Sequence, residues 1–341
     1  MYTDLFASID LALARRVALV SGSQAPAKPL AIRVFDAHTE GDGSVTLELF
    51  DRTLVISDNS NLSDEDPRKS QAIATHMSAQ WPWLTSVLLK ARRASEPSIR
   101  AGTFLRGGRE DLPTYIEENG VKYAVDLLLH QDTSLYLDTE PLRAWLTRES
   151  RGRSVLNTFA YTGSLGIAAL AGGASRVLQV DRSARFLALA ARSQELNGFK
   201  QNPRDLIAED VFRVLSKLKS RGSLVDLVLL DPPFFSQTDA GTVDLVQEPL
   251  RLLDKVQPLV GHNGRIVLVH NALFLSGNSL HEALSRRCDP RYLSIESRID
   301  ATCWGPTPNW PADPAPYNHP TKITVLRVLR KDQSPSNLTV R

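Results

Sequence analysis

The chain has 341 residues, of which 42% are hydrophobic, and this is more apolar material than a single domain of ordinary size requires. Its formal net charge of +2 at pH 7 excludes a uniformly basic surface, so a polyanionic partner such as RNA must bind to a local patch. The two cysteines, Cys288 and Cys303, exclude a disulfide framework, no Cys/His spacing predicts a metal site, and we expect a reduced, cytoplasmic protein.

Residues 1–30 are predicted to form an N-terminal extension that contains an amphipathic helix. The stretch Leu11–Ala14 is apolar, but Asp4 and Asp10 precede it and two arginines follow it. This order of charges is opposite to that of a signal peptide. No run in the chain approaches the roughly 18 apolar residues that a membrane span requires, so we expect no membrane partner.

Residues 31–128 are predicted to form a small, β-rich α+β domain that helps to orient the substrate. Short β-rich runs separated by turns predict a small antiparallel sheet. Between these runs, Lys69–Arg93 has helical periodicity, which Trp81-Pro82-Trp83 interrupts. The strands are expected at Ala31–Phe35, Val45–Phe50, Thr53–Ser57, Tyr115–Glu117 and Lys122–Leu127, with Asn119-Gly120 as the turn of the last hairpin.

Residues 129–341 are predicted to form a Rossmann-like α/β domain. After a connecting helix at Leu142–Arg148, short apolar strands alternate with longer helical segments, which predicts a parallel sheet with helices on both faces. No helix separates the last two strands, so an antiparallel hairpin is expected to end the sheet. This is the ground plan of class I methyltransferases. The strands are expected at Val155–Phe159, Arg176–Val180, Asp205–Ala208, Leu224–Leu230, Arg265–His270, Leu293–Arg298 and Ile323–Val328.

The carboxyl ends of the first three strands carry groups suited to binding S-adenosylmethionine, because open α/β sheets bind ligands outside these ends. Gly163 and Gly166 allow close approach of the backbone to a ligand, or they form only a tight turn. Asp181 can accept hydrogen bonds from ribose hydroxyls and Asp210 from an adenine amino group, or each caps a helix. The expected cofactor contacts are Phe159, Tyr161, Thr162, Gly163, Gly166, Asp181, Arg182, Asp210, Val211 and Asp231.

The string Asp231-Pro232-Pro233-Phe234 follows the fourth strand and predicts a pocket for a planar amine. A ring amine is a weak nucleophile because its lone pair is delocalised, and hydrogen bonds from its protons to Asp231 and the Pro232 carbonyl favour attack. Phe234 would stack on the ring, and proximity to the methyl donor would supply much of the rate. These four residues are the candidate catalytic group. The alternative is a Pro-Pro turn closed by a buried Phe.

A nicotinamide or flavin oxidoreductase is the main competing class, since it also uses a glycine-rich loop and a ribose-binding acid. The dinucleotide fingerprint G-x-G-x-x-G brings the backbone against a pyrophosphate, but Tyr161 stands two residues before Gly163. That class also leaves the Asp-Pro-Pro-Phe string unexplained. We therefore favour methyl transfer.

These motifs resemble a known family, the bacterial methyltransferases of 23S ribosomal RNA that carry a small β-rich domain before a class I S-adenosylmethionine domain. The resemblance spans roughly residues 31–330. It implies a ribosomal RNA substrate, and it places cofactor contacts on Tyr161, Thr162, Gly163, Asp181, Asp210 and Asp231. The strings that carry it are Ala31–Phe35, Glu118–Leu127, Leu135–Asp138, Asn157–Gly163, Glu195–Gly198 and Asp231–Phe234.

Two departures from the family bear on the methylated atom. Members that methylate cytosine C5 begin with an RNA-binding module, whereas only about thirty residues precede Ala31, too few for a domain. C5 chemistry also needs a thiolate, and the segment Asn271–Leu275, where those relatives place it, has no cysteine. We expect methylation of a base nitrogen. Methylation of cytosine C5 stays an alternative, because Cys303 is a second possible source of the thiolate. Methylation of a protein or a small molecule, and a catalytically silent RNA-binding protein of the same fold, also stay open.

Three further features have both a functional and a structural interpretation. His270 can act as a base at the substrate or can pack in the interior. Residues 305–320, rich in proline and aromatic residues, form a stacking lid or a rigid surface loop. Two basic clusters bind phosphates or form solvated faces. The clusters are Lys90, Arg92, Arg93, Arg100, Arg106 and Arg109, and Arg143, Arg148, Arg151 and Arg153.

Overall fold

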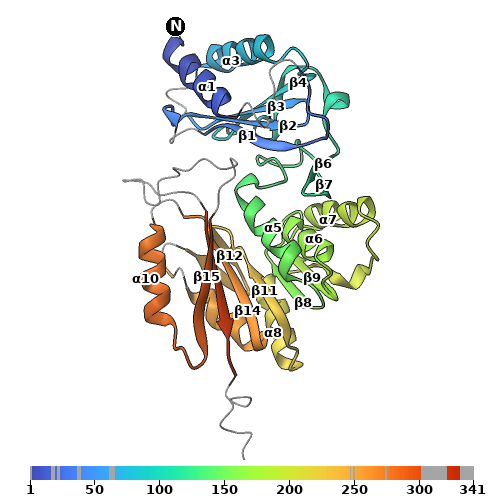
Figure 1. Cartoon of the computed structure of the whole chain (residues 1–341), viewed down its shortest axis with the longest axis vertical. Coiled ribbons are helices and arrows are strands. Elements are labelled where there is room, and N and C mark those ends of the chain that lie inside the picture. Colours follow the sequence, from blue (N-terminus) through green and yellow to red (C-terminus); the bar gives the residue numbers. More distant parts are fainter. Residues whose placement is uncertain are drawn as a thin grey trace, which may run out of the picture. The chain divides into compact units, whose positions relative to one another are not determined.

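The computed structural model describes residues 2–16, 20, 24–36, 40–60, 66–245, 247–248, 250–272, 275–300 and 321–330, which fall into two compact units, Met1–Leu137 and Asp138–Arg341 (Figure 1). The domain boundaries expected from the sequence lie at 30/31 and 128/129. The division between the units falls at neither place. Helix α1 (Thr3–Arg15) packs into the apolar core of the first unit, and carbonyls of residues 130 and 132 bind a lysine of that unit's sheet.

The first unit is built on a five-stranded sheet with the order β1-β2-β3-β4-β5. The antiparallel sheet predicted for residues 31–57 is confirmed, because β2 pairs antiparallel with both β1 and β3. The strand β4, which the sequence did not predict, adds to β3 in parallel. Their connection contains helix α3 (Pro67–Gln80), which supplies the long crossover that two parallel neighbours need. The strands are β1 (Ala31–Asp36), β2 (Val45–Phe50), β3 (Thr53–Asp58), β4 (Ser86–Ala91) and β5 (Thr103–Arg106).

The segment Lys69–Arg93, predicted as an interrupted helix, is a helix followed by a strand. Helix α3 (Pro67–Gln80) ends directly before Trp81, where Pro82 prevents continuation. Most of β4 is buried, as expected of an inner strand covered on both faces. The hairpin of β6 (Tyr115–Glu118) and β7 (Val121–Ala124) is confirmed, with positive φ at Asn119 and Gly120. The remaining helices are α4 (Pro97–Ala101) and the 3₁₀ turn η1 (Arg109–Asp111).

The second unit contains a seven-stranded sheet with the order β10-β9-β8-β11-β14-β16-β15. The first five strands run parallel, and β16 is antiparallel to both of its neighbours. This confirms the predicted Rossmann-like sheet with a terminal antiparallel hairpin. The strands are β8 (Ser154–Thr158), β9 (Arg176–Asp181), β10 (Leu206–Ala208), β11 (Val225–Leu230), β14 (Val260–His270), β15 (Leu293–Asp300) and β16 (Lys322–Val328).

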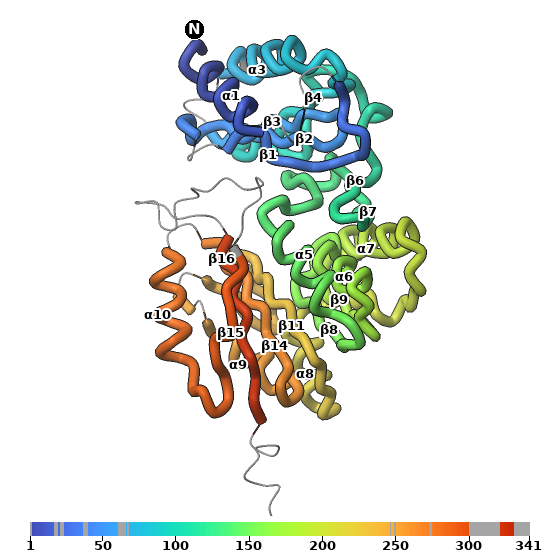
Figure 2. Tube along the Cα trace, viewed as in Figure 1, coloured from blue at the N-terminus to red at the C-terminus, as the bar shows by residue number. Residues whose placement is uncertain are grey.

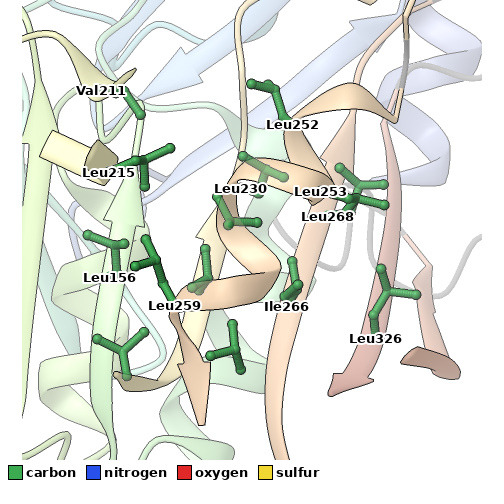
Figure 3. Packing of buried hydrophobic residues seen from close by; sticks show 14 of the residues in the cluster. Leu156, Val211, Leu215, Leu230, Leu252, Leu253, Leu259, Ile266, Leu268 and Leu326 are labelled. Atoms are coloured by element: carbon green, nitrogen blue, oxygen red, sulfur yellow. The ribbon is translucent and has the colours of Figure 1, made fainter. Parts of the chain in front are cut away.

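Helices cover both faces of this sheet (Figure 2). Apolar residues of α5 and α6 pack on one face, and those of α8, α9 and α10 pack on the other, where they meet leucines of the sheet (Figure 3). Burying each leucine contributes about 1.5–3 kcal/mol. The helices are α5 (Glu140–Glu149), α6 (Ser164–Ala171), α7 (Ala184–Leu196), α8 (Val211–Ser220), α9 (Arg251–Val256), α10 (Gly277–Arg287) and the 3₁₀ turns η2 (Leu137–Thr139), η3 (Pro203–Asp205) and η4 (Gln257–Leu259).

A second hairpin, which the sequence did not predict, follows β11. Strands β12 (Phe235–Thr238) and β13 (Gly241–Asp244) form a separate two-stranded sheet. Their turn lacks the Asn-Gly or Asp-Gly signal and is held instead by the Thr238 hydroxyl, which accepts the N–H groups of Ala240 (3.2 Å) and Gly241 (3.1 Å). Within the described part of the chain, no helix is both long and apolar enough to cross a membrane.

Candidate active site

The loop from β8 to α6 has an unusual backbone. Phe159, Tyr161 and Gly163 have φ angles of 53°, 50° and 80°, and a left-handed conformation is unfavourable for the two aromatic residues. Neighbouring groups impose it, because the Ala160 N–H donates to the Val180 carbonyl (2.8 Å) and the Tyr161 N–H to Asp181 Oδ2 (2.9 Å). The loop is therefore tied to the carboxyl end of β9.

Gly163 and Gly166 are needed because Gln179 fills the space behind them. A Cβ at Gly166 would lie 2.5 Å from Gln179 Oε1, and one at Gly163 would lie 2.7 Å from the same atom. Asn157 Nδ2 donates to this oxygen (3.1 Å), and both amides are buried. The glycines thus let the loop pack directly on the sheet.

Asp181 ends β9 and lies half-buried beside this loop. Its Oδ2 accepts the Tyr161 N–H, and its Oδ1 accepts the Ser183 N–H (2.8 Å). The alternative that Asp181 is the N-cap of α7 does not hold, because Ser183 occupies that position and accepts from Phe186 N. Burial raises the pKa of the carboxyl. Each oxygen retains capacity to accept a hydroxyl hydrogen bond.

Asp210 occupies the N-cap position of α8, the structural role that the sequence left open. Its Oδ1 accepts the N–H groups of Phe212 (2.9 Å) and Arg213 (3.4 Å). Val211 is buried in the core, so its side chain offers little surface to a ligand, whereas Phe212 is half-buried and Arg182 is exposed. Any ligand at the end of β10 would therefore meet the remaining carboxylate oxygen and the Phe212 ring.

Asp231 lies half-buried at the carboxyl end of β11, and its carboxylate has no hydrogen-bond or ion-pair partner among the described residues. Burial, together with the negative charge of Asp138, raises its pKa to about 7. Asp138 precedes α5 and accepts a hydrogen bond from the Thr321 hydroxyl. Sequence reasoning did not assign Asp138 to the site, because only the fold brings the two carboxylates close together.

The string Asp231–Phe234, which we call the proline corner, contains one buried and two exposed residues after the aspartate. Pro232 is buried and Pro233 is exposed. The Phe234 ring is 42% exposed, and the Phe234 carbonyl accepts the Leu245 N–H (3.1 Å). This differs from the alternative in which a buried Phe closes a Pro-Pro turn. The corner therefore contains an exposed aromatic residue and a carboxylate that has no partner in the described part of the chain.

His270 is fully buried at the end of β14. Its Nδ1 accepts the Ala272 N–H (3.4 Å), while Nε2 has no partner among the residues that the structure describes. Burial and the nearby Lys322 ammonium lower its pKa to about 4. The imidazole is therefore neutral at pH 7 and is a weak base, which favours the packing role over the catalytic one.

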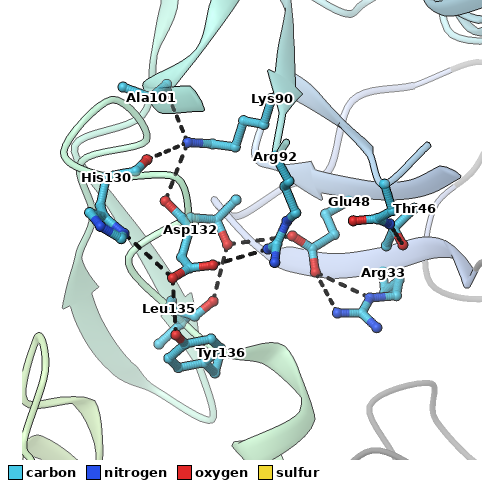
Figure 4. Close-up of polar contacts among 12 residues, drawn as sticks. Arg33, Thr46, Glu48, Lys90, Arg92, Ala101, His130, Asp132, Leu135 and Tyr136 are labelled. Atoms are coloured by element: carbon cyan, nitrogen blue, oxygen red, sulfur yellow. Dashed lines mark hydrogen bonds and ion pairs between the residues drawn. The ribbon is translucent and has the colours of Figure 1, made fainter. Parts of the chain in front are cut away.

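Two of the ten basic residues grouped by the sequence are not on a surface. Lys90 is fully buried, and its Nζ donates to the carbonyls of Ala101 (2.8 Å), His130 (2.8 Å) and Asp132 (3.3 Å) (Figure 4). Arg143 is also buried and donates to Thr139 Oγ1 (2.8 Å). Residues 301–320, with the predicted lid and Cys303, lie outside the described residues. The described part of the chain contains no cluster of three or more His, Cys, Asp or Glu residues that is suited to a metal ion.

Residues 86–306 match the family model of S-adenosylmethionine-dependent methyltransferases. The chain belongs to this family. It is therefore an S-adenosylmethionine-dependent methyltransferase, which confirms the enzyme class and cofactor predicted from the sequence.

Individual methyltransferases of known name are similar to this one. The Bacillus subtilis protein YwbD, named provisionally as a ribosomal RNA large subunit methyltransferase, is 30% identical over 278 residues, which cover 78% of this chain and 68% of YwbD. Ribosomal RNA large subunit methyltransferase I of Aeromonas salmonicida is 41% identical over 128 residues, which are 38% of this chain and 32% of that protein. The solved structure of SMU.776, described provisionally as a methyltransferase in complex with SAH, has a TM-score of 0.79 at 19% identity and covers 96% of this chain and 81% of that one. The last likeness supports the fold alone.

Proposed function

We propose that this methyltransferase transfers a methyl group to a nitrogen atom of a base in ribosomal RNA. Two of the relatives above are named for the large-subunit RNA. The observation that carries the proposal is the corner after β11, where Asp231, whose carboxylate has no partner among the described residues, stands three residues before the exposed Phe234. The corner lies beside β8, at the point where the strand order of the sheet reverses, which is where such sheets bind ligands.

The residues at the ends of β8 and β9 fit the cofactor. The Asp181 carboxylate, held by two backbone N–H groups, would accept hydrogen bonds from the ribose hydroxyls. The remaining contacts expected from the sequence are Phe159, Tyr161, Thr162, Gly163, Gly166, Arg182, Asp210 and Val211, of which Val211 contributes through its backbone. S-adenosylmethionine would supply an electrophilic methyl group on a sulfonium. Neither a metal ion nor a particular oligomeric state is part of the proposal.

The proline corner would hold and activate the target base. The Asp231 carboxylate and the Pro232 carbonyl would accept hydrogen bonds from the amine protons, which favours a pyramidal nitrogen with an available lone pair. Phe234 would stack on the ring and fix its plane. As the new N–C bond forms, the bond between the methyl group and sulfur would break, with S-adenosylhomocysteine as the leaving group. The nitrogen would then carry a positive charge and must lose a proton. Asp231, with a pKa of about 7, is suited to accept it.

The described residues favour nitrogen over cytosine C5. C5 is not nucleophilic until a thiolate adds at C6. Cys288 is the one cysteine among the described residues, and it lies between α10 and Leu293, the first residue of β15. This end of β15 is at the opposite end of the strands from the site, which lies where β14 ends at His270. Burial also raises the pKa of its thiol, which disfavours the thiolate. Nitrogen methylation needs no such nucleophile.

Transfer from methyl-labelled S-adenosylmethionine to cell extract from a strain that lacks this gene would test the proposal. We expect label in RNA that nuclease releases and protease does not, and an N-methylated base when the nucleosides are separated by mass spectrometry. Protease-sensitive label would indicate a protein substrate. Label in 5-methylcytidine would indicate C5 chemistry. Cofactor binding without transfer would indicate a silent RNA-binding protein.

A further inference from the structure

Phe235, the residue directly after the proline corner, has a ring that is 56% exposed. It begins the hairpin β12–β13, which follows β11 directly after the proline corner. Phe234 and Phe235 are the exposed aromatic rings among the described residues of the second unit. Exposing a large apolar ring is unfavourable, so two adjacent ones beside a candidate site suggest a binding surface.

The pairing of the hairpin directs the Phe235 ring outward. Side chains alternate between the two faces of a strand, and residues opposite each other share a face. Ser236 is opposite Val243, which is buried in the core of the second unit. Phe235 is opposite Asp244 and therefore lies on the other, outer face.

The hairpin is fixed to the body of the second unit. Gly241 lies so close to the Phe212 ring that a Cβ there would be 2.7 Å from it. Arg213 Nη2 forms an ion pair with Asp239 Oδ2 (2.5 Å), and Leu245, directly after the hairpin, is also part of the core. The exposed ring therefore stands on a rigid support, which lowers the entropy cost of binding a partner to it.

We propose that Phe235 stacks on the unpaired nucleotide that neighbours the target base in the RNA chain. This rests on the proposed function, since Phe234 would then contact the target base itself. Residues 235–244 contain two carboxylates and no cation, so the hairpin is suited to the flat face of a base rather than to a phosphate. Two adjacent rings among polar residues are also a small surface for a protein partner.

The test measures steady-state transfer to an unmodified large-subunit ribosomal RNA transcript by wild type and variants. For Phe235→Ala and Phe235→Leu we expect the KM for RNA to rise about five- to twentyfold, the lower range of base–aromatic stacking, with the dissociation constant for S-adenosylmethionine unchanged. Phe235→Tyr should retain the wild-type KM. Leu224→Ala is the matched control, because Leu224 is 49% exposed and precedes the other end of β11.

Four results would overturn the inference. An unchanged KM in Phe235→Ala, while wild type methylates RNA, leaves the ring without a role in RNA binding. A wild-type KM in Phe235→Leu shows that apolar bulk suffices and that stacking is not involved. A change of oligomeric state in Phe235→Ala makes the ring a contact between two copies. Absence of transfer to RNA by wild type defeats the proposed function itself.

Discussion

Lys90 in the first unit is fully buried and Asp231 in the second is half-buried, and the surroundings of the two charges differ. Three main-chain carbonyls accept hydrogen bonds from the Lys90 ammonium, which uses all of its donors (Figure 4). The Asp231 carboxylate has no donor among the described residues and lies near a second carboxylate. Burial lowers the pKa of Lys90 to about 8 and raises that of Asp231 to about 7.

This difference distinguishes Lys90, a charge with a structural role, from Asp231, a charge to which we assign a functional role. A buried ion that the protein solvates with its own dipoles contributes to a fixed arrangement, here the attachment of residues 130–132 to β4. A buried ion without partners is an unfavourable element that folding alone does not explain. A ligand that donates hydrogen bonds to Asp231 would remove that cost, which is why we assign this carboxylate to the substrate.

Substituting Asp231 should have the largest effect. We expect Asp231→Ala to lower the rate of methyl transfer about a hundredfold or more, because the amine loses its hydrogen-bond acceptor and proton acceptor. Circular dichroism should show a retained fold. Asp254→Ala, which removes an exposed carboxylate on α9, is the control and should transfer normally. Wild-type turnover by Asp231→Ala would remove Asp231 from the catalytic group.

Substituting Lys90 should affect stability and not the chemistry. Lys90→Met leaves three main-chain carbonyls without the donor that they share, so urea denaturation should show a loss of about 2–5 kcal/mol in the free energy of unfolding. Lys28→Met is the control, since its ammonium is largely exposed and pairs with Glu117 at the surface. Equal stabilities of the two variants would contradict the structural role.

Substituting Asp181 should weaken the cofactor without affecting the target base. For Asp181→Ala we expect a dissociation constant for S-adenosylmethionine about 5- to 150-fold higher, the scale of charge-assisted hydrogen bonds. Isothermal titration calorimetry measures it, with Glu282→Ala on the exposed side of α10 as the control. An unaltered constant would exclude Asp181 from the cofactor site.

The raised pKa of Asp231 predicts a pH dependence of cofactor binding. Below about pH 7 the carboxyl is protonated in the free protein and cannot attract a sulfonium. The affinity for S-adenosylmethionine should therefore fall as the pH is lowered through 7, by up to about tenfold per pH unit, while that for S-adenosylhomocysteine, whose sulfur carries no charge, changes less. Asp231→Asn should abolish this difference. Parallel curves for both ligands in wild type would contradict the assignment.

The cysteines should give the smallest effect. Cys288→Ser removes a half-buried thiol at the edge of the sheet opposite the site, and we expect activity within about twofold of wild type. Cys303→Ser is predicted from the sequence to be equally harmless. Loss of transfer in either variant would favour methylation of cytosine C5. A covalent RNA adduct that wild type forms and the variant does not would favour the same reaction.

Local sequence patterns predicted most of the second unit but not every pairing. Short apolar strands between helices, and the residues at their ends, depend on nearby sequence alone, so the sheet and the loop at Tyr161 were found. The parallel strand β4 was missed because a buried apolar run has no period that distinguishes strand from helix. The hairpin after Phe234 was missed because its strands are polar. Asp138 joins Asp231 only through the folding of distant segments.

The packing of Gln179 behind the loop glycines has a consequence for sequence variation. Because its amide occupies the volume that a methyl group at position 166 would need, the two sites are coupled through size rather than charge. Gly166→Ala should be disruptive alone and better tolerated together with a shorter side chain at position 179. A redesign of this loop must therefore change positions 166 and 179 together, so that a larger residue in the loop is matched by a smaller one in β9.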